Sequence, residues 1–152
     1  IIEKENIDLS NLILELVQYF EYLAEDRRMT FILELEKGIQ IYGNADLLKR
    51  ALSNLIINAI DYGVEGQNIV ISTKSTKDHF DIQVLTTNIF IDKQHLDHLF
   101  ERFYQIDSSR HSKAKTGGLG LSIVKSIMLL HSGEASAYNN DKGIVFSLNF
   151  KY

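Results

Sequence analysis

The chain has 152 residues and a formal net charge of −4 at pH 7, and 45% of its residues are hydrophobic and 24% charged. This length suits one domain that buries a core without disulfides or structural metals. The absence of cysteine excludes disulfide frameworks, Cys-type zinc sites and thiol catalysis. The mild acidity argues against a dedicated nucleic-acid-binding domain. No apolar run reaches the roughly 18–20 residues of a membrane span, and no secretory signal opens the chain. We therefore expect one soluble cytoplasmic domain and, because residue 1 is Ile rather than Met, a piece of a longer protein.

The first elements are predicted from the spacing of hydrophobic residues. Over 9–24 they follow helical spacing, which predicts an amphipathic helix with Asp8 as its N-cap. Apolar and polar residues alternate over 31–35, which predicts a half-buried strand, and a short strand is expected over 39–42.

The middle of the chain predicts a helix followed by a hairpin. Residues 45–62 place their apolar side chains on one stripe, and Gly63 is suited to cap the C-terminus of this helix. Strands are expected over 69–73 and 80–85, joined by a tight turn.

The last third of the chain predicts a loop between two helices. Residues 95–103 are expected to form one short helix, and 104–118 a long, polar, basic loop of the kind that is usually functional or disordered. Residues 119–131 are apolar nearly all round, which predicts a deeply buried helix. Strands are expected over 134–138 and 144–151.

The predicted order of elements is α-β-β-α-β-β, a short helix, a loop, and then α-β-β. Hairpins dominate this order. We therefore expect a mixed, mostly antiparallel sheet with helices on one face, which is a two-layer α/β sandwich.

Two asparagines on the second predicted helix are candidate ligands. Asn54 and Asn58 are four residues apart and hence share one face, which Asp61 and Tyr62 continue one turn later. Neutral amide oxygens can coordinate Mg²⁺ without adding a charge that repels a polyphosphate. The alternative is that both asparagines are ordinary solvated helix residues.

Two further segments could bind an anion. The glycines of the Thr-Gly-Gly-Leu-Gly-Leu segment 116–121 would let the backbone approach a phosphate at a helix start, although they also fit an ordinary loop-to-helix junction. The Leu-Phe-Glu-Arg-Phe-Tyr-Gln-Ile-Asp segment 99–107 is followed by Arg110, Lys113 and Lys115. These cations suit an anionic ligand, or they simply decorate a solvated loop.

In this order and spacing, the three segments resemble the catalytic ATP-binding domain of bacterial sensor histidine kinases. That family shares its nucleotide fold, the Bergerat fold, with gyrase, mismatch-repair and chaperone ATPases. Residues 52–62 look like the N box, 100–104 like the F box and 118–125 like the G2 box, and the likeness spans about 8–151. The region 100–107 also looks similar to that of metal-sensing members.

The resemblance implies a set of site residues. Asn58 would hold Mg²⁺, Asn54 would line the same pocket, and Tyr62 would lie beside adenine. His131 resembles a structural turn rather than the phosphoacceptor. The remaining ATP-binding residues that the resemblance implies are Thr86, Asn88, Arg102, Phe103, Arg110, Lys113, Gly118, Leu119 and Gly120.

The resemblance also implies a function. The domain would position Mg-ATP for phosphoryl transfer to a histidine on a dimerisation domain of the same protein, in two-component signalling with a response regulator. Those dimerisation and phosphoacceptor helices are not expected in this chain, and the parent protein is expected in the bacterial inner membrane, with this domain in the cytoplasm. No nucleic-acid partner is expected.

Two positions depart from the family pattern. The G1 box should fall at 86–91, but Thr86 stands where an adenine-reading Asp belongs, and Asn88 and Phe90 replace both glycines. Phe90 is bulky enough to fill the base pocket. Asp61 stands where Lys or Arg is usual. These departures leave open a nucleotide-poor, degenerate domain that acts as a regulatory or interaction module.

A third possibility is a metal-binding domain. His95 and His98 lie three residues apart and could share a metal with Asp92 or Glu101, although such histidines are more often solvated helix residues.

Overall fold

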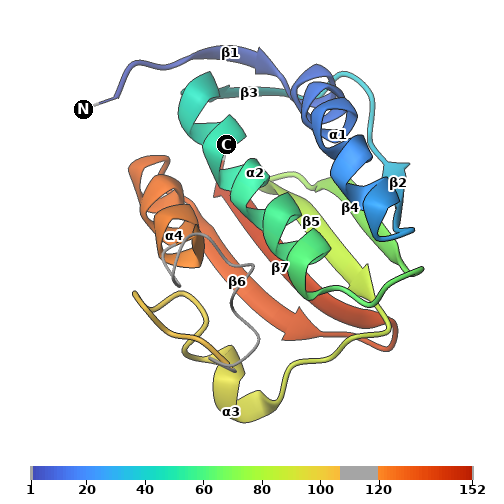
Figure 1. Ribbon diagram of the computed structural model, residues 1–152. Coiled ribbons are helices and arrows are strands. Elements are labelled where there is room, and N and C mark those ends of the chain that lie inside the picture. Colours follow the sequence, from blue (N-terminus) through green and yellow to red (C-terminus); the bar gives the residue numbers. More distant parts are fainter. Residues whose placement is uncertain (1, 107–119, 152) are drawn as a thin grey trace.

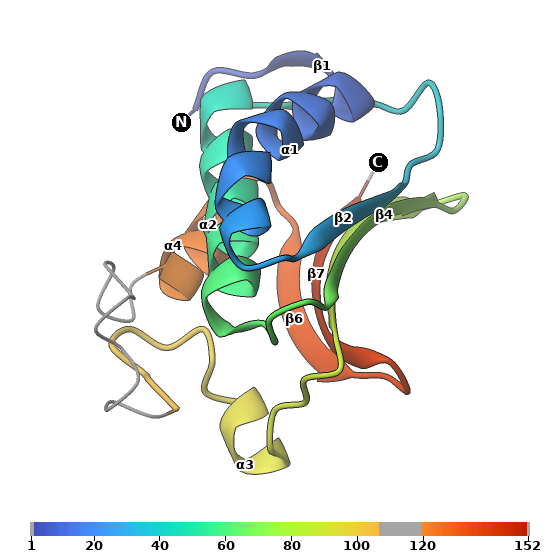
Figure 2. The same ribbon diagram turned by 45° about the vertical axis from the view of Figure 1, so that its right-hand side comes forward.

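The computed structural model of the chain describes residues 2–106 and 120–151. Figures 1 and 2 show two layers, with α1, α2 and α4 on one face of the main sheet. The described elements are β1 (Glu5–Asp8), α1 (Leu9–Asp26), β2 (Thr30–Glu34), β3 (Gln40–Gly43), α2 (Ala45–Tyr62), β4 (Asn68–Ser75), β5 (His79–Thr87), α3 (Lys93–Leu96), α4 (Gly120–Leu130), β6 (Glu134–Asn139) and β7 (Gly143–Lys151).

The described residues form a five-stranded sheet in the order β2-β4-β5-β7-β6. Within it β2 and β4 pair in parallel, whereas β4–β5, β5–β7 and β7–β6 are antiparallel. The predicted two-layer α/β sandwich with a mostly antiparallel sheet is confirmed.

A short ribbon of β1 and β3 lies beside this sheet and was only half predicted. The two strands pair antiparallel, with Ile7 opposite Ile41. We expected a strand near β3 but none before α1. The strand β1 has only four residues, and because Ile7 alone among them is buried, no alternating hydrophobic pattern marks it in the sequence.

The core lies between the helices and the inner face of the sheet. Ile69, Ile82 and Leu148 from three neighbouring strands are almost completely buried beneath Leu52 and Leu55 of α2. The rings of Phe80 and Phe150 stack with their centroids 4.9 Å apart. Burying these side chains contributes about 1.5–3 kcal/mol each to folding.

Two predicted helix ends are confirmed. The Asp8 side chain accepts a hydrogen bond from the Asn11 backbone N–H at 3.2 Å and caps α1. Gly63 is the C-cap residue of α2, but its φ of −66° is not left-handed. Glycine is therefore required there by lack of space and not by backbone conformation, because a Cβ atom would lie 2.5 Å from the Ala59 carbonyl oxygen.

The predicted helix over 95–103 is wrong. The helix α3 ends at Leu96, and the chain continues in turns, because the N–H of His98 bonds to the carbonyl of His95 and the N–H of Glu101 to that of His98, both at 3.0 Å. These three-residue spacings belong to tight turns rather than to an α-helix.

The predicted deep burial of the helix after the glycine-rich segment is also wrong. In α4 the buried residues are Val124, Ile127 and Met128, whereas Leu129 is 65% and Leu130 49% exposed. The helix packs against α2 and β6 on one side, and no described element covers its other side. The hydrophobic residues on all sides of α4 therefore did not indicate that the helix is buried on all sides.

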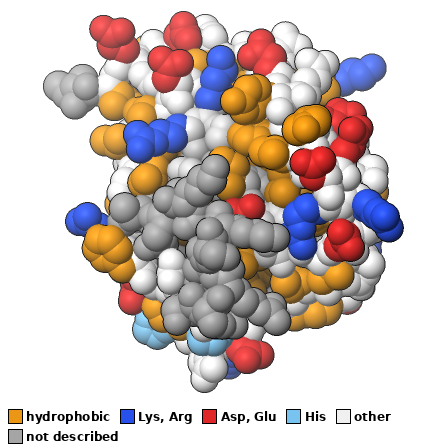
Figure 3. Space-filling view, in the orientation of Figure 1, with side chains coloured by type: hydrophobic (Ala, Val, Ile, Leu, Met, Phe, Trp, Pro, Cys, Tyr) orange, Lys and Arg blue, Asp and Glu red, His pale blue; other side chains and the backbone are white. Residues whose placement is uncertain are grey.

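Hydrophobic side chains also gather on the surface over α1, as Figure 3 shows. Two tyrosines of α1, Tyr19 and Tyr22, are more than two-thirds exposed. Within the described ranges, the helices are all too short or too polar to traverse a lipid bilayer.

Candidate nucleotide site

The amides of Asn54 and Asn58 lie on one face of α2, as predicted, and both side chains are half-buried. Within 2–106 and 120–151 neither side chain makes a hydrogen bond to another residue. Their amide groups are therefore not used by the fold and remain accessible from outside the protein. Two amide groups that share a helix face are therefore available to an external ligand.

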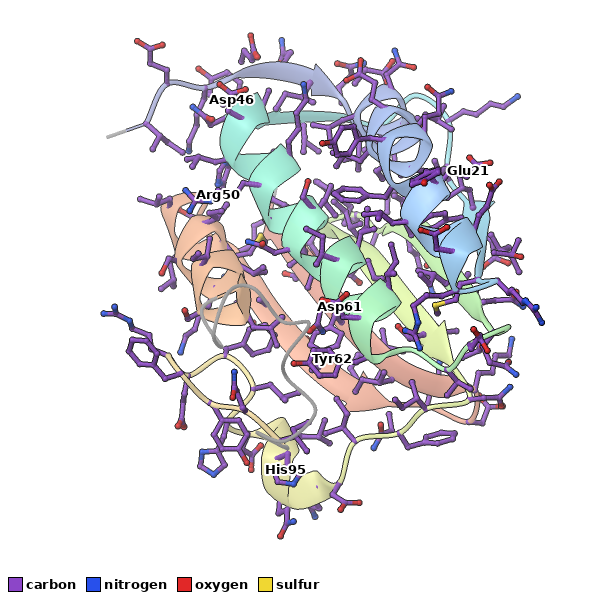
Figure 4. All side chains as sticks on the ribbon, viewed as in Figure 1. Glu21, Asp46, Arg50, Asp61, Tyr62 and His95 are labelled. Carbon is purple, nitrogen blue, oxygen red and sulfur yellow. The ribbon has the colours of Figure 1, made fainter. Side chains whose placement is uncertain are left out.

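Asp61 and Tyr62 project from the last turn of α2 toward the side on which α4 and α3 lie (Figure 4). Burial raises the pKa of the Tyr62 phenol above its ordinary value, and the negative charge of Asp61 raises it further. The Asp61 carboxylate is therefore close enough to the Tyr62 phenol to influence its ionisation, at the C-terminal end of α2.

Arg27 anchors this end of α2 from the end of α1. Its guanidinium donates to the backbone carbonyls of Ile60 and Asp61, the latter at 3.2 Å. A cation is favourable where a helix leaves carbonyls without intrahelical partners. The position of the last turn of α2 therefore depends on a residue that sequence reasoning did not single out.

The end of β5 approaches α2 at Gly63. A Cβ atom on Gly63 would lie 2.4 Å from Met29 Cε, 2.5 Å from the Ala59 carbonyl oxygen and 3.1 Å from Thr86 Cγ2. Gly143 similarly approaches the backbone of Thr86, because its Cβ would lie 2.0 Å from the Thr86 carbonyl oxygen. Two glycines thus enclose Thr86, which is 3% exposed.

Asn88 keeps the backbone geometry for which a glycine is expected. Its φ is +58°, in the left-handed region that Asn tolerates better than most residues. The N–H of Asn88 donates to the Lys142 carbonyl at 2.8 Å, and its side-chain amide donates to Gln67 Oε1. Asn88 therefore forms a hydrogen-bonded turn directly after β5.

Phe90 points outward. Its side chain is 54% exposed, whereas Ile89 and Ile91 pack against the core. The side chain of Asn139 fixes the segment by accepting from the N–H of Ile91 at 3.0 Å and donating to its carbonyl at 2.8 Å. This exposure is the opposite of what a side chain that fills an interior base pocket would have.

Arg102 and Phe103 lie on the surface after α3. The guanidinium carbon of Arg102 is 5.4 Å from the centre of the Phe103 ring, within the range of a cation–π contact. Phe103 is 65% exposed with a φ of +67°, while Phe100 packs against the core. The candidates Arg110, Lys113, Gly118 and Leu119 lie outside the described residues, and Gly120 is the first residue of α4.

His95 in α3 and His98 just after it do not form the metal centre that we considered. His98 Nδ1 lies 2.6 Å from Glu101 Oε2, and His95 hydrogen-bonds to the Tyr104 hydroxyl instead. Among the described residues, Asp92 included, no three His, Cys, Asp or Glu side chains gather closely enough to hold a metal ion.

Comparison with known proteins shows the family. The family described as "Histidine kinase-, DNA gyrase B-, and HSP90-like ATPase" matches residues 43–152. Sensor histidine kinase CusS of Escherichia coli (strain K12) is 38% identical over 146 residues, which cover 95% of this chain and 30% of CusS. The chain thus spans about a third of the length of such curated relatives.

Solved structures show the same fold. The catalytic domain of histidine kinase ThkA has a TM-score of 0.86 at 24% identity, covering 99% of this chain and 97% of that one. ThkA in complex with response regulator protein TrrA has a TM-score of 0.82 at 23% identity, covering 97% and 41%. The chain belongs to the histidine kinase-, DNA gyrase B- and HSP90-like ATPase family, as a catalytic domain of the sensor histidine kinase type.

Proposed function

We propose that this domain binds Mg-ATP and presents its γ-phosphoryl group to a histidine on another part of a longer sensor kinase. The observation that carries the proposal is the pair of half-buried amides on α2, Asn54 and Asn58, which make no hydrogen bond within the described chain. Amides that the fold itself does not use are free to coordinate a metal ion or to bind a polar ligand.

Mg²⁺ fits this donor set. Asn58, with Asn54 beside it, would offer neutral amide oxygens, and Mg²⁺ commonly combines few protein ligands with water and substrate phosphates. The metal would neutralise phosphate charge during transfer. Catalysis would then depend mainly on how α2 orients the nucleotide rather than on a protein nucleophile.

Further residues would contact the other parts of the nucleotide. Tyr62 is 39% exposed at the end of α2 and would offer its ring beside the base. Thr86 in β5 and Asn88, which directly follows β5, would border the base. Arg102 and Phe103 lie exposed before the 107–119 segment, in which Arg110, Lys113, Gly118 and Leu119 would approach the phosphates.

The partners and location are part of the same proposal. The phosphoacceptor histidine would lie on a dimerisation domain of the parent protein, and a response regulator would receive the phosphoryl group. ThkA, which shares this fold, has been solved in complex with the response regulator TrrA. We propose a cytoplasmic position beneath a parent protein anchored in the bacterial inner membrane, by analogy with its sensor-kinase relatives.

Asp61 favours a second candidate function. A carboxylate at the end of the helix that carries Asn58 repels a polyphosphate unless a cation intervenes. The domain could then be a nucleotide-poor regulatory module on the same fold. The left-handed Asn88 and the exposed Phe90 favour the binding function, because the altered segment retains a turn and leaves its aromatic ring outside.

Isothermal titration of the chain with AMPPNP and Mg²⁺ tests the two candidates. Binding at micromolar to high-micromolar concentration, weakened at least tenfold by Asn58→Ala, supports the ATP-binding function. No heat at about 1 mM nucleotide, combined with binding gained in a Thr86→Asp, Asn88→Gly, Phe90→Gly variant, would favour the regulatory module instead.

A further inference from the structure

Arg27 lies where the C-terminal ends of two helices meet. It is the C-cap residue of α1, and its guanidinium donates to the backbone carbonyls of Ile60 and Asp61 in α2. Neither last turn, 23–26 in α1 or 59–62 in α2, contains a basic residue. Because carbonyls without intrahelical partners leave partial negative charge at a helix C-terminus, a cation between two such ends is favourable. Arg27 supplies that cation to both helices.

The main chain of Arg27 holds the segment that follows α2. Its carbonyl accepts a hydrogen bond from the Gly66 N–H at 3.1 Å. Its own N–H donates to the Ala24 carbonyl at 3.0 Å, which fixes Arg27 to the end of α1. Along the chain, Tyr62 therefore lies between two points, at Asp61 and at Gly66, that the same residue holds in place.

The last turn of α2 contains carbonyls that the helix itself cannot satisfy. The Ala59 carbonyl accepts from the Gly63 N–H at 2.9 Å, whereas the carbonyls of 60–62 have no partner within the helix. The Arg27 side chain binds two of these three carbonyls. Asn58 lies one turn earlier, inside the continuous part of α2. Loss of the guanidinium should therefore loosen the turn that carries Tyr62 and leave Asn58 in place.

We propose that Arg27 is a positioning residue for the nucleotide, because by holding the last turn of α2 it fixes where the Tyr62 ring lies. This inference rests on the proposed nucleotide-binding function, in which Tyr62 flanks the base, and goes beyond it by assigning a role to a residue on another helix. Arg27 does not touch the nucleotide and acts only through Tyr62. An aromatic ring contributes to binding when its plane is aligned with the base, so a loosened turn loses that contact.

Three single variants give the expected effects. Arg27→Met keeps a long side chain but removes the charge and the donors, and it should weaken the binding of AMPPNP with Mg²⁺ by about three- to tenfold. Arg27→Lys keeps the charge but lacks the planar fork that spans two carbonyls, so it should recover part of this loss. Arg28→Met is the matched control, because Arg28 is the next residue and is exposed. It should change the affinity by less than about twofold.

A double-mutant cycle with Tyr62→Ala separates positioning from stability. If Arg27 acts through the Tyr62 ring, Arg27→Met should weaken AMPPNP binding in the wild-type background and change it by less than about twofold in Tyr62→Ala. A residue that only stabilised the fold would leave the affinity of a folded variant unchanged or lower it equally in both backgrounds. Isothermal titration measures the four affinities, and circular dichroism at the same temperature establishes that each variant is folded.

Two results would overturn the inference while the proposed function stands, provided that Asn58→Ala weakens binding in the same assay. One is folded Arg27→Met binding AMPPNP as tightly as the wild type, and the other is an equal loss in both backgrounds. If Arg27→Met does not fold, Arg27→Lys takes its place in the cycle, with a smaller expected loss. Failure of the folded wild-type chain to bind AMPPNP would instead overturn the proposed function together with the inference.

Discussion

The backbone N–H of Asn44 donates a hydrogen bond of 3.0 Å to Nε2 of His131. The other ring nitrogen of His131, Nδ1, donates to the Ile127 carbonyl at 2.8 Å, and the ring fills the space above Gly43, where a Cβ would lie 3.0 Å from its Cδ2. His131 thus joins the end of α4 to the start of α2, the helix that carries Asn54 and Asn58.

His131→Ala should therefore destabilise the fold. The substitution leaves the Asn44 N–H without its partner and opens a gap next to Gly43, which together should lower the free energy of unfolding by about 3 kcal/mol. For a domain of this size the melting temperature would fall by about 6–12 °C. Thermal and urea denaturation, followed by circular dichroism, measure the change.

His98→Ala is the matched control. His98 is an exposed histidine that pairs with Glu101 three residues later and stacks on the Tyr104 ring, so its removal should change stability by less than about 1 kcal/mol. If both variants unfold alike, the link between α2 and α4 has no energetic role.

The close approach at Gly63 gives a second prediction. In Gly63→Ala the new methyl would meet both the side chain of Met29 and the backbone of Ala59, and backbone cannot move aside cheaply. We expect a loss of about 2–3 kcal/mol in the free energy of unfolding, measured by urea denaturation.

Gly38→Ala separates sterics from backbone strain. Gly38 has a φ of +76° and nothing within 4 Å of its would-be Cβ, so alanine there should cost about 1 kcal/mol through backbone strain alone. An equal or smaller loss in Gly63→Ala would show that α2 and β5 do not pack as tightly as the structure has them.

The sequence predicted what local periodicity encodes. The bounds of α2 and the caps at Asp8 and Gly63 were predicted correctly, because apolar spacing and cap chemistry act within one or two turns. The partial burial of α4 and the strand β1 were not predicted correctly, because each depends on contacts with residues distant in the sequence. Leu130 is exposed since no described element covers that side of α4, and Ile7 becomes a strand residue only by pairing with Ile41.

The candidate site divides in the same way. Asn54 and Asn58 were identified because four-residue spacing on a helix fixes a common face. The supporting residues Arg27, Gln67 and Asn139 were missed, because they come from separate elements and no spacing relates them to α2 or to 86–91. The left-handed φ of Asn88 was indicated by the residue type, because Asn adopts this conformation more often than most residues. The sequence alone did not establish that Asn88 has this conformation.

Asn58→Ala should separate binding from stability. Because the Asn58 amide makes no hydrogen bond within the described chain and alanine is the better helix former, the melting temperature should stay within about 2 °C or rise slightly. Affinity for AMPPNP with Mg²⁺ should fall at least tenfold, measured by isothermal titration.

Asn11→Ala is its control. Asn11 is another helical asparagine, but its side chain donates to Asp8 at 3.1 Å on α1. This change should lower stability slightly and leave the nucleotide affinity untouched. A large loss of stability in Asn58→Ala, with affinity unchanged, would mean that Asn58 serves the fold rather than the ligand.

The raised pKa of Tyr62 predicts how stability depends on pH. Burial first, and then the charge of Asp61, disfavour the phenolate in the folded protein, so the folded state holds its proton to higher pH than the unfolded state does. The contribution to stability is complete below the ordinary pKa of 10.0 and is lost as pH rises through the raised value. The free energy of unfolding should therefore decline above about pH 10 in the wild type and less steeply in Tyr62→Phe.

Absorbance of the phenolate near 295 nm resolves the same group directly. The difference between wild type and Tyr62→Phe isolates one of the seven tyrosines, and Asp61→Asn should move its midpoint downward while leaving it above the ordinary value, because burial remains. Tyr19→Phe, which removes an exposed ring on α1, should leave that upward-shifted transition in place. A midpoint that Asp61→Asn leaves unmoved would show that the carboxylate lies too far from the phenol to act on it, and the electrostatic obstacle to phosphate at the end of α2 would then be correspondingly weaker.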